Sequence, residues 1–145
     1  MRIDLDAPII PWIGLGGIRL YSKVDEIKDI LNAPETKKEV SYDDTRYEIE
    51  NAIYIFVNNY NNKVYKLTAT DNYRGTLFEQ IKIGMNVNDI LKIEPSFEYE
   101  DFEEVFISPK GILVERDLND IVFWISVHIE ELNTISDDDF WAGKW

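Results

Sequence analysis

The feature that most constrains the fold is an internal repeat, in which a short pattern recurs after 63 residues. Ile18-Arg-Leu20 matches Ile81-Lys-Ile83, and Val24-Asp-Glu-Ile27 matches Val87-Asn-Asp-Ile90. In both places a short apolar stretch precedes residues at helical spacing, and a proline then ends the helix. A pattern repeated in this way predicts a fold built from two similar halves.

Each half continues with about three segments whose alternating or β-branched residues are typical of strands. These segments are 46–50, 53–57 and 64–69 in the first half, and 104–108, 112–116 and 121–129 in the second. Helices are expected over 22–31 and 86–93, before the strands of each half. Asn-rich and Pro-Gly-containing turns between the strands favour antiparallel hairpins.

We therefore expect an α+β fold: a mostly antiparallel sheet built from two tandem α-β-β-β repeats, with helices packed on one face. The length fits a single domain over 1–145. Repeat one covers about 17–70, repeat two covers about 80–130, and a C-terminal arm covers 131–145. The last residues of this arm, 141–145, are either a docked end strand or a partner-binding arm.

The net charge of −13 arises almost entirely in the last third of the chain. Residues 1–93 carry 14 acidic and 12 basic side chains, whereas residues 94–145 carry 14 acidic and 3 basic. A protein this acidic repels nucleic acid and anionic membranes, so we expect neither as a partner. The expected partner is a protein with a basic surface.

Two acidic runs in this region are interleaved with aromatic residues. The first run holds Glu94, Glu98, Glu100, Asp101, Glu103 and Glu104, and the second holds Glu130, Glu131, Asp137, Asp138 and Asp139. The aromatic residues among them are Phe97, Tyr99, Phe102, Phe140, Trp141 and Trp145. Acidic runs often serve only solubility. Large rings beside them are typical of protein interfaces, which favours a patch that attracts a cationic partner.

The last expected strand supplies further candidates. If Ile121, Phe123, Ile125, Val127 and Ile129 face the core, then Val122, Trp124, Ser126 and His128 face away from it. Trp124 is then either covered by a loop or by the C-terminal arm, or it is an aromatic anchor on an exposed sheet face. In the first half, Tyr54 and Phe56 would lie on the corresponding outward side.

From these patterns we predict a partner-binding surface. Trp124, His128 and Trp141 are its expected anchors. The expected acidic residues are Glu100, Asp101, Glu103, Glu104, Asp137, Asp138 and Asp139.

Most catalytic and metal chemistry is disfavoured by composition. The chain has no cysteine, which excludes disulfides, thiolate metal sites and cysteine nucleophiles. His128 is the only histidine, and the acidic residues near it fit no metal-binding loop by their spacing. Ser126 and His128 share a strand face, but this does not define a catalytic triad. We expect no cofactor, no metal and no enzymatic activity.

The N-terminal residues do not form a signal peptide, because acidic residues and prolines interrupt any apolar stretch. The longest apolar segment, near 121–129, is far shorter than the roughly 20 residues of a membrane span. A cytoplasmic location is expected.

The second repeat carries the residues of a family resemblance. A short strand, then Gly-Met-Asn-Val-Asn-Asp-Ile-Leu at 84–91, then three strands, resembles the repeat of the β-lactamase inhibitor protein superfamily. Two tandem copies are similar to the inhibitor architecture, which implies a curved antiparallel sheet with one concave face and helices on the other. The absence of a lipid-anchor cysteine argues against the related lipoprotein of outer-membrane barrel assembly.

A small, acidic, cysteine-free protein of this kind also resembles the immunity proteins of bacterial polymorphic-toxin and contact-dependent inhibition systems. That resemblance implies a protein that binds a cationic toxin domain, possibly a nuclease, and blocks it sterically with acidic and aromatic side chains. The alternative is a non-catalytic scaffold module that binds an endogenous basic partner.

Overall fold

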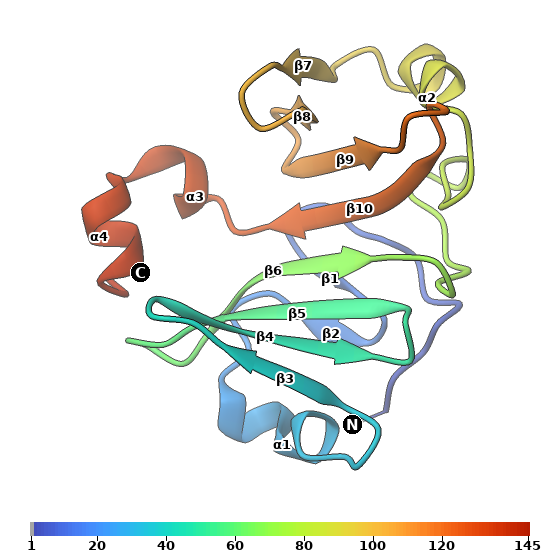
Figure 1. The fold of residues 1–145 in the computed structure, drawn as a ribbon. Coiled ribbons are helices and arrows are strands. Elements are labelled where there is room, and N and C mark those ends of the chain that lie inside the picture. Colours follow the sequence, from blue (N-terminus) through green and yellow to red (C-terminus); the bar gives the residue numbers. More distant parts are fainter. Residues whose placement is uncertain (1) are drawn as a thin grey trace.

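The computed structural model describes residues 2–145 and has an α+β fold centred on an eight-stranded antiparallel sheet (Figure 1). The sheet order is β3-β4-β5-β6-β10-β9-β8-β7. The first half of the chain contributes β3 (Lys37–Val40), β4 (Asp44–Ile49), β5 (Ile53–Asn58) and β6 (Val64–Ala69). The second half contributes β7 (Glu98–Glu100), β8 (Val105–Ser108), β9 (Ile112–Arg116) and β10 (Val122–His128).

The remaining elements are short. A second sheet has two strands, β1 (Gly14–Leu15) and β2 (Ile18–Arg19). A 3-10 turn, η1, spans Val24–Ile27. The helices are α1 (Lys28–Leu31), α2 (Val87–Ile93), α3 (Glu131–Thr134) and α4 (Asp137–Trp141). Among residues 2–145, no helix is long and apolar enough to cross a membrane.

The expected fold class is confirmed, and the sheet order shows how the two halves meet. Each half is a helical segment followed by a four-stranded meander, one strand more than the sequence predicted. The additional strands are the edge strands β3 and β7. The last strands of the halves, β6 and β10, pair antiparallel at the centre, with Ala69 opposite Ile125 and Leu67 opposite Val127. The sheet order therefore runs symmetrically outward from this pair.

Two expected local elements differ from the structure. The segment 22–31 is not one helix, but divides into the 3-10 turn η1 and the single-turn helix α1. The segment 81–83 is not a strand, since Ile81 makes only an isolated bridge with Leu77. The helix expected over 86–93 is present as α2, and the Asn86 side chain accepts a hydrogen bond from Asn88 N at its start.

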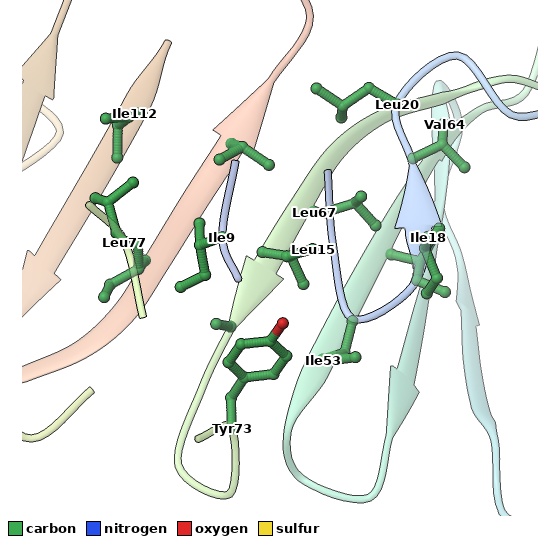
Figure 2. Close-up of a cluster of buried hydrophobic side chains, with 14 of the residues drawn as sticks. Ile9, Leu15, Ile18, Leu20, Ile53, Val64, Leu67, Tyr73, Leu77 and Ile112 are labelled. Carbon is green, nitrogen blue, oxygen red and sulfur yellow. The ribbon is translucent and has the colours of Figure 1, made fainter. Parts of the chain in front are cut away.

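The hydrophobic core lies between one face of the sheet and the N-terminal segment (Figure 2). Ile9, Leu15 and Ile18 of this segment belong to the same buried cluster as Ile53 and Leu67 of the sheet. The helical residues Ile27, Ile30, Leu31, Val87 and Ile90 are buried in this cluster as well. One continuous core thus joins both halves, and burying it supplies the main favourable term in folding.

The alternation predicted for the last strand is broken by a β-bulge in β10 between Val122 and Trp124. A bulge inserts one residue, so side chains before it lie on the face opposite to that predicted. Val122 is therefore fully buried, whereas Ile121 and Phe123, expected in the core, are only half-buried. The expected assignment of these three residues is wrong, while Ile125 and Val127 occupy the core as expected.

The C-terminal arm is docked on the domain. Phe140 is 3% exposed, and its ring packs edge-on against Tyr65, with 5.3 Å between centroids. Asn58 Nδ2 donates a hydrogen bond to Phe140 O (3.0 Å), and Lys63 Nζ donates one to Trp145 O (3.0 Å). The arm is therefore docked, but the end strand expected for 141–145 is wrong, because the arm packs as the helix α4 and not through strand pairing.

Candidate protein-binding face

The sheet has a second face, opposite the N-terminal segment, which we call the open face. In Figure 1, β1 and β2 lie behind the sheet, and α3 and α4 lie beyond one end of its central strands. On β5, residues 53, 55 and 57 are buried in the core, and Tyr54 and Phe56 between them are half-buried on the open face. The cross-strand pairs Tyr54–Thr68, Phe56–Lys66 and Trp124–Glu115 extend this face across the sheet.

Aromatic rings form a continuous row along the open face, which we call the aromatic strip. It consists of Phe123, Trp124, Tyr54, Phe56, Tyr65 and Trp141. Tyr65 is only 5% exposed, so it is a buried member of the row that connects Phe56 to Trp141. Successive ring centroids lie 5.5, 5.4, 6.4, 6.1 and 5.5 Å apart. These separations are those of favourable aromatic pairs. The strip brings the predicted anchors Trp124 and Trp141 onto one row, although it spans three strands and the C-terminal arm.

Two small hydroxyl residues lie under the larger side chains at the centre of this face. Thr68 on β6 and Ser126 on β10 are 0% and 1% exposed, and their hydroxyl oxygens lie 2.7 Å apart. Because they satisfy each other, neither leaves an unpaired polar group when water is removed above them. The centre of the open face can therefore be covered by a partner without cost from these two groups.

Two basic side chains lie on rings of the strip. Lys66 Nζ is 4.2 Å from the Phe56 ring centroid, and Arg46 Cζ is 5.2 Å from that of Tyr54. Both distances are within the range of cation–π attraction. Arg46 also pairs with Glu39 at 2.8 Å. Burial lowers the pKa of Lys66, although the carboxylates of Glu115 and Asp44 act in the opposite direction.

An acidic groove of about 450 Å³ adjoins the Trp124 end of the strip. It is lined by Glu103, Glu104, Glu115, Asp117 and Asp120, together with Arg116, Leu118 and Phe123. Arg116 Nε pairs with Asp120 at 3.2 Å, so most of the carboxylates are left without a basic partner in the groove. Burial raises the pKa of Glu115, and Glu103 raises it further while Lys66 lowers it.

The other predicted acids of the first run have different surroundings. Glu100 shapes the turn between β7 and β8, because its carboxylate accepts hydrogen bonds from Phe102 N (3.1 Å) and from Glu103 N. Asp101 is exposed in the same turn. Phe102 at the tip of this turn is 88% exposed, and Leu118 in the groove is fully exposed. Phe102 is one of the rings noted beside the first acidic run, whereas the exposed Leu118 was not identified from the sequence.

The second acidic run lies at the opposite end of the strip. Asp137, Asp138 and Asp139 form the first turn of α4, where negative charge is favourable, and Ser136 caps that turn. Asp137 and Asp138 line a hollow of about 380 Å³ that also includes Trp141. Asp139 is 3.3 Å from Lys144 Nζ. The predicted acids thus fall into two groups, one at each end of the strip, and do not form a continuous rim.

His128 does not belong to the exposed surface, and its predicted outward position is wrong. It is 1% exposed, its Nδ1 lies 2.8 Å from Ile129 O, and the Trp12 ring packs edge-on against it with 5.6 Å between centroids. Burial lowers its pKa. Gly111 permits this arrangement, because a Cβ there would come within 2.7 Å of the Trp12 ring, and its φ of +85° suits glycine.

Lys66 and Glu115 were not identified from the sequence. The available signal for Lys66 was a single charge in the otherwise uncharged strand Val64–Ala69. No local sequence pattern pointed to Glu115. Its surroundings are formed by Trp124 on the paired strand and by Glu103 in the turn between β7 and β8. Within residues 2–145, no group of three or more His, Asp or Glu side chains is arranged to hold a metal ion.

No protein-family model and no curated protein matches this sequence. Among solved structures, the chain is similar to a cysteine-rich secretory protein from Staphylococcus aureus subsp. aureus Mu50, with a TM-score of 0.49 and 12% sequence identity. The similarity covers 91% of this chain and 52% of that one. This chain therefore spans about half the length of that protein chain. The present sequence contains no cysteine.

Proposed function

We propose that this protein is a non-catalytic inhibitor that binds a basic protein domain on its open face, as an immunity protein binds a toxin. The observation that carries the proposal is the aromatic strip, flanked at its two ends by acidic groups. Rings such as Trp124 and Tyr54 supply large, rigid contact area, and such residues dominate the binding energy of protein interfaces. The acids make the surface complementary to a cationic partner.

The two kinds of residue have separate kinetic roles in this proposal. The carboxylates of the acidic groove and of α4 act at long range and raise the association rate. The rings of the strip lose contact with water on binding and slow dissociation. The partner is thereby held over the sheet, where it is sterically blocked from its own substrate. For a nuclease toxin, the carboxylates would occupy the region that binds the phosphates of its substrate.

Site-specific photo-crosslinking in the native host tests this proposal. A photoreactive phenylalanine analogue at position 54 lies within the strip. The control is the same analogue at Ile13, a side chain that is 45% exposed and directly precedes β1 behind the sheet (Figure 1). We expect a covalent adduct from position 54 and none from position 13. The captured protein should be basic and encoded next to this gene, and it should lose its toxicity when the two are mixed.

Binding kinetics with the captured protein give a second measurement. The Debye length falls from about 10 Å at 0.1 M salt to about 3 Å at 1 M. The association rate should therefore fall steeply over this range, while the dissociation rate changes little. An acidic captured partner, or an association rate that is independent of salt, would contradict the proposed mode of binding. A basic endogenous partner that is not toxic would instead identify the protein as a scaffold module.

A further inference from the structure

The open face contains one basic group whose charge is not balanced by a close contact. Lys66 lies on the central strand β6, between Phe56 on β5 and His128 on β10. Its ammonium is 4.2 Å from the Phe56 ring centroid, the shortest cation–ring distance among the described residues. The side chain is half-buried. It therefore lies beside the aromatic strip, with Phe56 on one side and the buried His128 on the other.

Within residues 2–145, Lys66 Nζ forms no hydrogen bond and no ion pair shorter than 4.0 Å. Asp44 already accepts a hydrogen bond from Tyr65 Oη at 2.6 Å. Glu115 lies on β9, with β10 between it and the strand of Lys66. Arg46 differs, because Glu39 pairs with it at 2.8 Å. Of these two basic groups, Lys66 is thus the one without a paired carboxylate, so its ammonium depends on water for solvation.

Covering the face would remove that water. Burial of an unpaired ammonium is strongly unfavourable, whereas a well-placed carboxylate offsets most of this cost. Burial already lowers the pKa of Lys66 in the free protein. A partner that lies flat on the strip must therefore provide an anionic group above Lys66.

We propose that Lys66 is the contact point for a carboxylate of the bound protein, an inference that rests on the proposed function and defines the partner further. The partner surface would carry an aspartate or glutamate at its centre, surrounded by the basic groups that face the acidic ends of the strip. Such a pattern provides specificity, because a uniformly basic surface would leave Lys66 buried and unpaired. The acidic groups at the two ends of the strip repel a free anion. The carboxylate must therefore belong to a partner whose surrounding surface is basic.

A titration of the full-length protein with benzoate tests the anion site directly. Benzoate combines a carboxylate with a ring that can rest on the strip, and benzamide is its neutral counterpart of the same shape. The readouts are the NMR signals of the Lys66 Cε methylene and the Phe56 ring, at about 0.15 M salt, where charges beyond about 8 Å are screened. We expect saturable shifts with benzoate and at least tenfold weaker binding of benzamide.

Two variants make the result specific to Lys66. Lys66→Met keeps the aliphatic stem and removes the charge, and it should weaken benzoate binding at least tenfold at Phe56. Lys38→Met is the matched control, since Lys38 also lies near a ring, 5.9 Å from the Tyr47 centroid, but is exposed on β3. It should bind benzoate as the unmodified protein does.

Three results would overturn the inference: no benzoate shift, equal binding of benzoate and benzamide, or equal loss in both lysine variants. These failures are distinct from failure of the proposed function. Crosslinking from position 54 without benzoate binding would leave the docking face intact and refute the role of Lys66. Benzoate binding without a crosslinked partner would support an anion site at Lys66 and refute the docking of a basic protein.

Discussion

At the scale of single residues, Trp124 and Ile125 are consecutive on β10 but lie in different surroundings. Ile125 is 0% exposed in the core between the sheet and the N-terminal segment. Trp124 is half-buried on the open face, where its ring contacts Tyr54 and Phe123. Of these two side chains, Ile125 therefore belongs to the core, whereas Trp124 remains partly exposed to water.

This difference predicts unequal effects on stability. Ile125→Ala removes fully buried methyl groups and should lower the free energy of unfolding by about 2–5 kcal/mol. Trp124→Ala removes a ring that is only partly withdrawn from water, and should cost about 1–2 kcal/mol. Urea denaturation of both variants measures the two losses. If Trp124→Ala proved the more destabilising, its ring would belong to the core and not to a binding face.

His128 predicts a pH dependence of stability. Burial lowers its pKa in the folded protein, so the unfolded chain binds the proton more tightly. The free energy of unfolding should therefore decrease as the pH falls below about 6.5, the ordinary histidine value, and should show no contribution from His128 above that range. His128 is the only histidine, so its single imidazole C2 proton reports the folded pKa by NMR.

The control is His128→Gln, which cannot titrate in this range. Carboxylate effects are common to both proteins, so the difference between their stability–pH curves isolates the imidazole. A difference that stays constant between about pH 7.5 and 5.5 would contradict burial of the neutral ring against Trp12.

At the scale of elements, the C-terminal arm depends on one buried ring. Phe140 contacts Tyr65 edge-on and stacks on Trp145, with 5.7 Å between the second pair of centroids. The helices α3 and α4 have four and five residues, too short to be stable without packing. The arm is therefore held by tertiary contacts and not by its own helical preference.

We predict that Phe140→Ala releases the arm while leaving the sheet folded. Amide hydrogen exchange should become fast in 131–145, and protection in β5, β6 and β10 should be retained. Leu132→Ala on α3 is a milder comparison, because that side chain is only partly buried against the core. Loss of protection throughout the sheet in Phe140→Ala would show instead that the arm is part of the central folding unit.

At the scale of the whole molecule, the two halves share a sheet and a core. The β6–β10 pair joins the halves, and one cluster of buried residues extends from Ile9 to Phe140. Neither half alone would satisfy the backbone groups of its inner strand. Although the repeat is visible in sequence and topology, we therefore expect the two halves to fold as one unit.

This arrangement predicts one cooperative unfolding transition. Far-ultraviolet circular dichroism, which reports the sheet, should give the same midpoint as tryptophan fluorescence, which reports Trp12, Trp124 and the C-terminal arm. Two separated transitions, one for each half, would show that the halves are independent units joined by weak contacts.

Much of the strand arrangement was predictable because its signals are local. The bounds predicted for β6 and β9 agree with the structure, and β5 extends one residue further. Alternation of Tyr54 and Phe56 with buried residues also placed them correctly on the outward side. The acidic character of the last third is a property of composition alone. Such patterns depend on only a few neighbouring residues, so they can be recognised without knowing how the rest of the chain folds.

Other features were decided only by tertiary structure. The bulge in β10 depends on pairing with β9, and it changes the face of every residue before it. His128 is buried because Trp12, far away in the sequence, packs on it. Lys66 lies on the Phe56 ring only because β5 and β6 pair in this register. The sequence by itself determined where the charge lies and which segments form most strands of the sheet, but not the edge strands β3 and β7. Strand register and long-range packing decided which side chains meet. Both are established only when the whole sheet packs onto its core.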